Sequence, residues 1–245
     1  IFKEEKIKAV RKYVSSGEID PSKSLNLDLE LILYRNKTYM VIAVSNPKGY
    51  KKRDESRRAF DPLRVISIRL AKILINLSKA NKEILDPFCG TGTILQEALL
   101  MNLNVVGSDV NVEAAKRNLE WLGNNYKNKW KLFRTDVKDV SKYVKVVECV
   151  VTEPYLGPYF RKLPTEEEII DIVNQLNKLY YNALKELYKI VNKRLIIIIP
   201  VFKTKSKFYY TEFDSIINEI GFKISQPIKD IKVPILYTDK NKKLD

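Results

Sequence analysis

Histidine is absent from the 245 residues of the sequence. This absence excludes Ser-His-Asp and Cys-His catalysis, histidine-ligated zinc and imidazole pH switches. Only two cysteines, Cys89 and Cys149, are present. They are too few for a four-cysteine metal site, and nothing else indicates a disulfide framework. We therefore expect a reduced, cytoplasmic protein without a metal centre.

Long apolar runs are also missing. The most apolar uninterrupted runs, residues 39–44 and 195–199, are far shorter than the roughly 20 residues that a membrane helix needs. No signal peptide is recognisable either, so no membrane contact is expected. Because 45% of the residues are apolar, a packed core is feasible. The chain opens on Ile1 instead of Met, so we expect part of an N-terminal module to be missing.

Acidic residues are fewer than basic ones: 30 Asp+Glu against 44 Lys+Arg give a net charge of +14. Residues 1–80 hold 18 basic and 9 acidic side chains, net +9, which leaves 26 and 21, net +5, for the rest. The densest stretch, residues 48–72, has nine basic and three acidic side chains. Such a stretch favours a polyanionic partner through counterion release. The alternative interpretation is a solvated, lysine-rich surface.

Apolar periodicity predicts the secondary structure. Residues 1–47 contain a charged amphipathic helix (2–16) and a hairpin formed by residues 25–34 and 39–44, with Asn36 in the turn. Asp61 and Pro62 are expected to start a helix. Strands and helices then alternate, with strands at residues 83–86, 104–108, 131–134, 146–151, 195–199, 222–225 and 233–238, and helices at residues 93–101, 112–122, 166–191 and 213–220.

This alternation indicates an α/β fold, a doubly wound and mostly parallel sheet of seven strands with helices on both faces. We expect two parts: a small N-terminal α/β extension over residues 1–47, and the main domain over residues 48–245. In such a sheet, function lies at the carboxyl ends of the strands.

Glycine is scarce, but two of the eight glycines fall in one motif, Asp86-Pro87-Phe88-Cys89-Gly90-Thr91-Gly92-Thr93, between a strand and a helix. Small residues there let a ligand approach the N–H groups of the helix. The motif is neither Gly-x-Gly-x-x-Gly nor a P-loop, which weakens the alternative of a nicotinamide oxidoreductase. Cys89 is expected to be a small packing residue.

Acidic residues end three successive strands: Asp86, Asp109 and Asp136. An N-cap of the following helix is the alternative role for any one of them. Three of them together favour a cleft lined by carboxylates.

The run from Ile84 to Leu122, with the glycine motif, Gly107-Ser108-Asp109 and Asn118-Leu119, resembles class I S-adenosylmethionine-dependent methyltransferases. Within them it is most similar to the tRNA guanine-N2 methyltransferases, which often carry an N-terminal THUMP module. The resemblance covers residues 45–200 and implies the Rossmann-like class I methyltransferase fold. It implies that residues 86–93 hold the methionine part of the cofactor, Asp109 and the adjoining Val110 the ribose, and Asp136 with Val137 the adenine. The basic residues before the motif, also similar to that family, are expected to bind RNA: Lys51, Lys52, Arg53, Arg57 and Arg58.

The substrate motif departs from the family. Relatives that methylate exocyclic amines carry Asp/Asn-Pro-Pro-Tyr/Phe after the fourth strand, whereas this chain has Thr152, Glu153, Pro154 and Tyr155. Glu153 can replace the lost acceptor and take up the released proton, and Tyr155 can stack on the flipped base. Alternatively, Glu153 and Pro154 only shape a turn and the protein is inactive or has another substrate. Tyr209 and Tyr210 either stack on RNA or lie in a solvated loop.

We therefore expect an RNA methyltransferase that transfers a methyl group from S-adenosylmethionine to the exocyclic N2 amine of a guanine in tRNA. A partner protein or an N-terminal RNA-binding module is expected to assist. The alternatives are a DNA adenine-N6 or cytosine-N4 methyltransferase and a catalytically inactive RNA-binding protein with the same fold.

Overall fold

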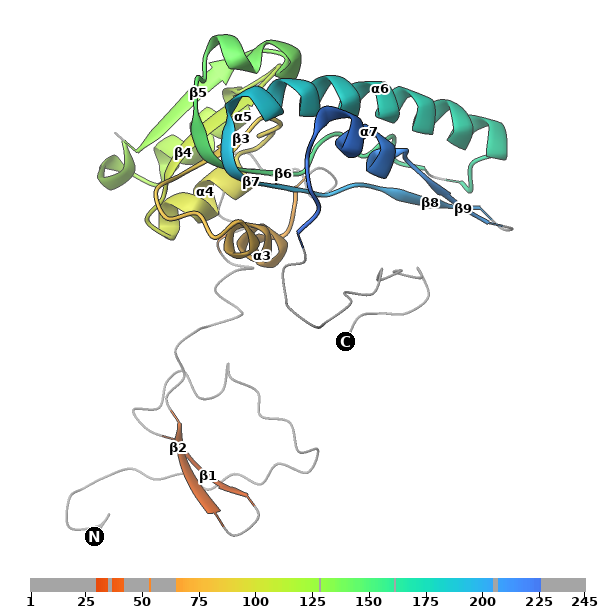
Figure 1. Cartoon of the computed structure of the whole chain (residues 1–245). Coiled ribbons are helices and arrows are strands. Elements are labelled where there is room, and N and C mark those ends of the chain that lie inside the picture. The colour runs from red at the N-terminus through yellow and green to blue at the C-terminus, as the bar shows by residue number, and fades with distance from the viewer. Residues whose placement is uncertain are drawn as a thin grey trace, which may run out of the picture. The chain divides into compact units, whose positions relative to one another are not determined.

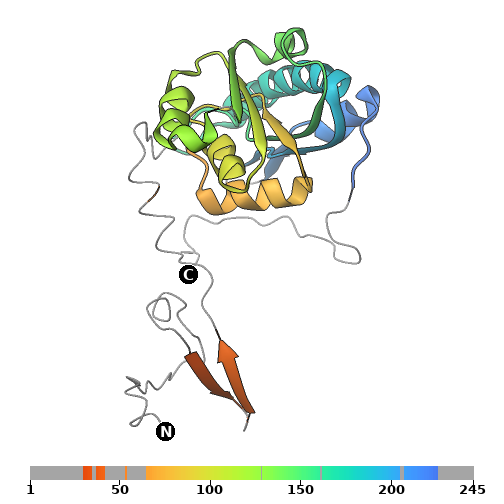
Figure 2. The same cartoon turned by 90° about the vertical axis from the view of Figure 1, so that its left-hand side faces the viewer.

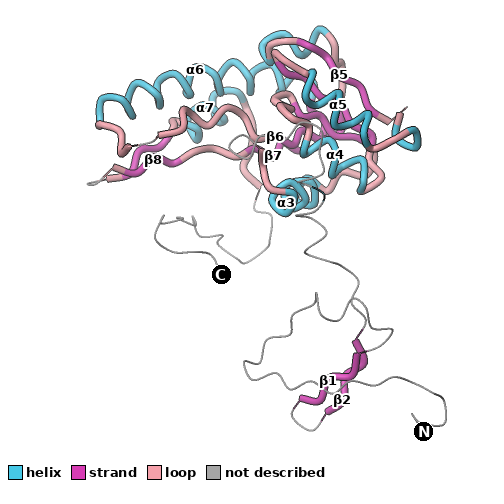
Figure 3. The backbone as a smooth tube through the Cα atoms, turned by 180° about the vertical axis from the view of Figure 1, so that it is seen from behind, coloured by secondary structure: helices cyan, strands magenta, loops and turns pink. Residues whose placement is uncertain are grey.

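A computed structural model describes residues 30–34, 37–41, 53, 65–127, 129–160, 162–204 and 207–225, drawn in colour in Figure 3. The chain divides into two units, Ile1–Arg57 and Arg58–Asp245. The boundary that the sequence suggests, between residues 47 and 48, stays a prediction.

In the first unit, strands β1 (Glu30–Tyr34) and β2 (Lys37–Val41) form an antiparallel hairpin. Their register runs from Glu30 opposite Val41 to Tyr34 opposite Lys37. The predicted hairpin is thus confirmed; residues 25–29 and 42–44 of the expected strands lie outside the described residues. The expected helix at residues 2–16 and the turn residue Asn36 lie outside the described residues.

The described part of the second unit is built on a parallel sheet of five strands in the order β5-β4-β3-β6-β7. The first four of these strands in chain order, β3, β4, β5 and β6, are each followed by a helix or a helical turn, as the alternation in the sequence predicts, whereas β7 is followed by the two short strands β8 and β9. The elements are α3 (Ile68–Ser78), β3 (Glu83–Asp86), α4 (Thr93–Leu100), β4 (Asn104–Asp109), α5 (Glu113–Trp121), η1 (Asn124–Tyr126), β5 (Trp130–Arg134), η2 (Val137–Lys142), β6 (Val147–Thr152), α6 (Glu166–Ile190), β7 (Val191–Ile197), β8 (Val201–Lys203), β9 (Phe208–Tyr210) and α7 (Phe213–Ile220).

Helices cover both faces of this sheet, because successive side chains of a strand point to opposite sides. On β3, Ile84 packs with the helices α3, α4 and α5, whereas its neighbour Leu85 packs with η2 and α6. Figures 1 and 2 show α3 and α6 on opposite sides of the sheet. A third cluster joins α6 to α7 around the fully buried Tyr180. The predicted class, an α/β fold with helices on both faces, is confirmed.

The amino end of the sheet is held by one carboxylate. Glu148, on β6, accepts hydrogen bonds from the backbone N–H groups of Asn81 (3.1 Å), Lys82 (2.7 Å) and Glu83 (3.2 Å). The ammonium group of Lys193 on β7 lies 2.6 Å from its other oxygen. Glu148 therefore links the chain entering β3 to the two strands β6 and β7.

The predicted strand at residues 222–225 is wrong, since these residues form neither strand nor helix. Gly221 (φ +103°) ends α7 in the left-handed region, and the N–H of Phe222 donates to the carbonyl of Ile217 at 2.9 Å. The ring of Phe222 then packs edge-on against Tyr188 of α6, with centroids 5.0 Å apart. The chain thus turns towards α6, and the sheet has five strands within the described residues. The expected strand at residues 233–238 lies outside them.

Three other boundaries differ from the sequence-based prediction. Helix α3 begins at Ile68, where the hydroxyl of Ser67 accepts the N–H of Leu70 at 3.2 Å and caps the helix; the expected start at Asp61 and Pro62 lies outside the described residues. Strand β7 begins at Val191, directly after α6, because Val191 and Arg194 also pair with β6, opposite Val147 and Cys149. The loop expected after it contains the antiparallel hairpin β8–β9, which lies beside the N-terminal part of α6 (Figure 1).

None of the helices within the described ranges combines the length and apolar character that crossing a bilayer requires.

Candidate functional site

The glycine motif forms the connection between β3 and α4. Gly90 (φ +50°) and Gly92 (φ +82°) both have left-handed backbones, which glycine adopts without strain. A Cβ atom on Gly92 would lie 3.2 Å from the Cα of Ala115 on α5, so the loop can pass α5 only with glycine there. Gly92 is also the N-cap of α4 and offers no side chain. No side chain of the N-cap residue therefore covers the start of α4, and the role of its N–H groups in binding a ligand stays a prediction.

Asp86, the first residue of the motif, ends β3 and is 2% exposed. Its carboxylate accepts the hydroxyl of Thr152 at 2.7 Å and the N–H of Phe88 at 3.2 Å. Burial raises the pKa of Asp86 to about 7, and the nearby charges of Asp109 and Glu153 act in the same direction. A cation placed beside Asp86 would be stabilised by its ionised form.

Asp109 ends β4 and contacts the same loop. One carboxylate oxygen accepts the N–H of Gly90 at 2.9 Å, and the other accepts the N–H of Asn111 at 3.2 Å. Asp109 does not cap α5, whose N-cap is Val112. Its role is therefore to join the carboxyl ends of β3 and β4 at the loop, which fits the cleft interpretation of the sequence.

Asp136, at the end of β5, differs from the other two. It is the N-cap of η2, with its side chain accepting the N–H of Lys138 at 3.0 Å. The alternative role that the sequence left open for each Asp is thus found at Asp136. Of the two valines expected near the cofactor, Val110 is 64% exposed and Val137 is buried.

Asn118 contacts the loop from the side; it is one of the residues that carry the family resemblance, but the sequence assigned it no role. It lies on α5, fully buried, and its amide donates to the carbonyl of Thr91 at 2.8 Å. A signal was present, since Ala115, Asn118 and Leu119 share the buried stripe of α5. A polar residue in such a stripe is expected to have a specific hydrogen-bond partner.

A small pocket of about 50 Å³ brings the glycine motif together with the substrate motif. Two of its lining residues, Asp86 and Glu153, carry carboxyl groups, and none of the lining residues that the structure describes is basic. Burial raises the pKa of Glu153 as well. The lining residues are Ile66, Asp86, Phe88, Cys89, Gly90, Thr91, Thr93, Ile94 and Glu153.

The substrate motif has two buried and two more exposed members. Thr152 is fully buried and gives its hydroxyl hydrogen to Asp86, so this hydroxyl faces the motif and not a substrate. Pro154 is buried, Glu153 is half-buried, and Tyr155 is 56% exposed. Glu153 and Tyr155 are therefore the members positioned to meet a ligand.

The structure describes Cys89 but only one of the five residues expected to bind RNA. Cys89 is 4% exposed, and burial raises the pKa of its thiol, which fits the expected packing role. Four of the five expected RNA-binding residues lie outside the described residues: Lys51, Lys52, Arg57 and Arg58. Arg53 is described but belongs to the first unit.

Two curated proteins resemble this chain in sequence. The tRNA (guanine(10)-N2)-dimethyltransferase of Pyrococcus abyssi is 33% identical over 187 residues, which are 72% of this chain and 49% of that protein. The enzyme of the same name from Methanothermobacter thermautotrophicus is 37% identical over 121 residues, which are 47% of this chain and 35% of that protein. The chain thus spans half or less of the length of these relatives.

Among solved structures, TrmN from Thermus thermophilus aligns with a TM-score of 0.47 and 16% identity, over 74% of this chain and 57% of that one. Residues 56–216 match the family described as RMKL-like, methyltransferase domain. This match covers the sheet, the glycine motif and the Thr152–Tyr155 motif together. The resemblance inferred from the sequence motifs is confirmed: the chain belongs to the RMKL-like methyltransferase domain family.

Proposed function

We propose that this chain is an S-adenosylmethionine-dependent methyltransferase that acts on the exocyclic N2 amine of a guanine in tRNA. The observation that carries the proposal is the shared pocket, in which the glycine motif and Glu153 lie against each other. Membership in a methyltransferase domain family and the names of the curated relatives support the same reaction. Since those relatives are named for guanine 10 and dimethylation, N2,N2-dimethylguanosine at position 10 is the product to look for.

The residues present suit the charge of the cofactor. S-adenosylmethionine carries positive charge on its sulfonium and ammonium groups, and the described lining of the pocket includes the carboxyl groups of Asp86 and Glu153 and no basic residue. Gly90 leaves room for a ligand to approach the backbone closely, whereas the space beside Gly92 is taken by Ala115 of α5. Asp109, at the adjacent strand end, supplies a carboxylate for the ribose hydroxyls. We assign the adenine to the Asp136–Val137 end of the site.

Bound S-adenosylmethionine supplies a methyl group on a leaving group that departs as a neutral sulfide when the guanine amine attacks. The chain's own residues must orient that amine and accept its proton. The carboxylate of Glu153 is the acceptor we assign, because Thr152 is fully buried with its hydroxyl against Asp86, whereas Glu153 is half-buried and lines the pocket. The exposed ring of Tyr155 offers a stacking face for the base.

RNA binding completes the proposal. The basic stretch at residues 48–72 would position the tRNA by its phosphates, without base readout. We include an additional RNA-binding module or partner protein, because the curated relatives are longer than this chain. A cytoplasmic location also belongs to the proposal, supported by the free, buried state of both cysteines.

The test is incubation with methyl-labelled S-adenosylmethionine and separate pools of unmodified tRNA, rRNA and duplex DNA, followed by nucleoside analysis. We expect label in N2-methylated guanosine from tRNA, and none with Asp109→Ala. Label in N6-methyladenine or N4-methylcytosine of DNA would contradict the proposal. Cofactor binding by calorimetry without transfer to any pool would instead identify a binding protein that has lost turnover.

A further inference from the structure

The segment between β6 and α6 carries Glu153 and Tyr155 but has no regular secondary structure. A segment of this kind is expected to be mobile unless specific contacts fix it. Methyl transfer needs the acceptor group and the stacking ring within a fraction of an ångström of one geometry. The contacts that fix this segment therefore matter for the reaction.

One contact comes from the middle of α6. Tyr180 is fully buried, and its hydroxyl donates to the backbone carbonyl of Tyr155 at 2.9 Å. The ring of Tyr180 packs edge-on against Phe213 of α7, with centroids 6.4 Å apart. Burial raises the pKa of the Tyr180 hydroxyl, so it stays protonated as a donor.

A second contact lies two residues further on. Gly157 has φ +101°, and a Cβ atom there would lie 3.2 Å from the ring of Phe202 on β8 and 3.3 Å from Ile172 on α6. Phe202 also packs edge-on against Phe160, with centroids 6.4 Å apart. The backbone of the segment is thus held by α6 and the β8–β9 hairpin, while the side chain of Tyr155 is 56% exposed.

The Tyr180 hydroxyl is not needed for filling the core. A phenylalanine would occupy the same volume between α6 and α7 without the cost of burying a hydroxyl group. A buried hydroxyl is retained at no net cost only where it has a hydrogen-bond partner. Here its partner is the carbonyl of the residue whose ring is assigned to the target base.

We propose that Tyr180 is a positioning residue: its hydroxyl holds the carbonyl of Tyr155 so that Tyr155 and Glu153 face the methyl donor. The expected effect on the rate of methyl transfer rests on the proposed function. The expected restraint of residues 155–160 by Tyr180 does not, because it follows from the hydrogen bond alone.

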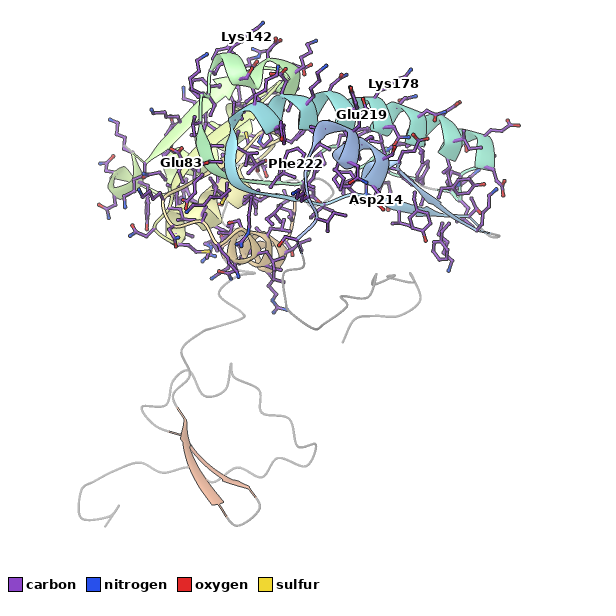
Figure 4. All side chains as sticks on the ribbon, viewed as in Figure 1. Glu83, Lys142, Lys178, Asp214, Glu219 and Phe222 are labelled. Atoms are coloured by element: carbon purple, nitrogen blue, oxygen red, sulfur yellow. The ribbon has the colours of Figure 1, made fainter. Side chains whose placement is uncertain are left out.

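The test compares Tyr180→Phe with Tyr181→Phe. Tyr181 is the next residue of α6, and its hydroxyl donates to Glu219 of α7 at 2.9 Å, away from the segment. Both variants lose one hydroxyl and one hydrogen bond. Figure 4 labels Glu219 on α7, which runs beside α6.

Two measurements are made on both variants of the full chain. Hydrogen exchange of the amides in residues 155–160 is expected to quicken by roughly tenfold in Tyr180→Phe and to stay unchanged in Tyr181→Phe. In methyl transfer to tRNA, kcat is expected to fall roughly tenfold in Tyr180→Phe, with the KM for S-adenosylmethionine unchanged. A general loss of stability would instead speed exchange throughout the second unit.

Unchanged exchange at residues 155–160 in Tyr180→Phe would overturn the inference. Quickened exchange with a kcat equal to that of Tyr181→Phe would overturn the positioning role, because pinning would then not matter for transfer. If the unaltered chain transfers no methyl group to any RNA, the proposed function fails, while hydrogen exchange still decides whether Tyr180 pins the segment.

Discussion

Thr152 on β6 donates its hydroxyl hydrogen to the carboxylate of Asp86 on the neighbouring strand β3, across 2.7 Å and with both side chains buried. Thr152 stands where amine-methylating relatives carry Asp or Asn, but in this chain it supports the cofactor loop. In the proposed mechanism, the acceptor for the amine is the next residue, Glu153. The residue that departs from the family motif, Thr152, is therefore also the hydrogen-bond donor that favours the ionised form of Asp86.

Thr152→Val should destabilise the fold, because it removes a donor from a buried carboxylate while keeping the volume. We expect a loss of about 2 kcal/mol at pH 8, where Asp86 is ionised, and a smaller loss at pH 5.5, where it is protonated. Urea unfolding at the two pH values measures the difference. Thr152→Ser, which keeps the hydroxyl, is the control, and an equal loss at both pH values would contradict the prediction.

Cofactor affinity should rise with pH through the titration of Asp86. Its pKa is about 7 in the free protein, and a bound cation favours the carboxylate, so binding releases a proton. Between pH 6 and 8 the affinity should increase by up to about tenfold. Calorimetry in buffers of different ionisation enthalpy counts the proton. Asp86→Asn should bind more weakly and without this pH dependence; a dependence that survives in that variant must come from another group.

Glu153→Gln should lower kcat for methyl transfer by roughly 100-fold, the usual scale for loss of a general base. Since burial raises the pKa of Glu153, activity of the unaltered chain should fall as pH drops through that raised value and the carboxylate becomes protonated. The pH–rate profile of Glu153→Gln should lack this acidic limb. Full activity in both Glu153→Gln and Tyr155→Ala would show that the base pocket lies elsewhere.

Glu148 should contribute stability that is lost in acid. The hydrogen bond from Lys193, together with those from the backbone N–H groups of residues 81–83, lowers the pKa of Glu148 to about 2. A lowered folded-state pKa gives stability that is present above the ordinary value near 4.5 and is lost as pH falls towards 2. Glu148→Gln should cost about 2 kcal/mol at pH 7 and less at pH 3. Lys193→Met, which removes only the cation, should cost less than Glu148→Gln does.

RNA affinity should depend steeply on salt if the basic stretch binds phosphates. Five contacts from Lys51, Lys52, Arg53, Arg57 and Arg58 predict a slope of roughly −3.5 to −4.5 for log K against log salt. Replacing Lys51 and Lys52 by Gln should make the slope shallower by about 2 and lower the affinity for all RNAs alike. Filter binding at several salt concentrations measures it. A slope near zero would remove these residues from the interface.

The sequence was sufficient where a local signal exists. The limits of β3 and α7, and the position of the glycine motif, follow from apolar runs and glycines within a few residues. Strand 222–225 was predicted from its alternation, but tertiary packing of Phe222 on Tyr188 overrides that weak preference.

The side-chain pairings could not be predicted in the same way. Thr152 and Asp86 are 66 residues apart, and Tyr180 and Tyr155 are 25 apart. Neither pairing leaves a periodic trace in the sequence, because each depends on strand order and on the rotation of α6. The motif at residues 152–155 could be located by its chemistry, but the division between Thr152 facing inward and Tyr155 facing outward required the fold.

The accessibility of the Cys89 thiol can report whether the glycine motif is open or closed. Its thiol is buried within the glycine motif with a raised pKa, so an alkylating reagent can reach a thiolate there only while the loop is open. The other cysteine, Cys149, lies fully buried in β6, an inner strand of the sheet. The alkylation rate of Cys89 thus reports local opening of the loop, and the alkylation rate of Cys149 reports opening of the sheet. A ligand that closes the loop should slow the alkylation of Cys89 more than that of Cys149.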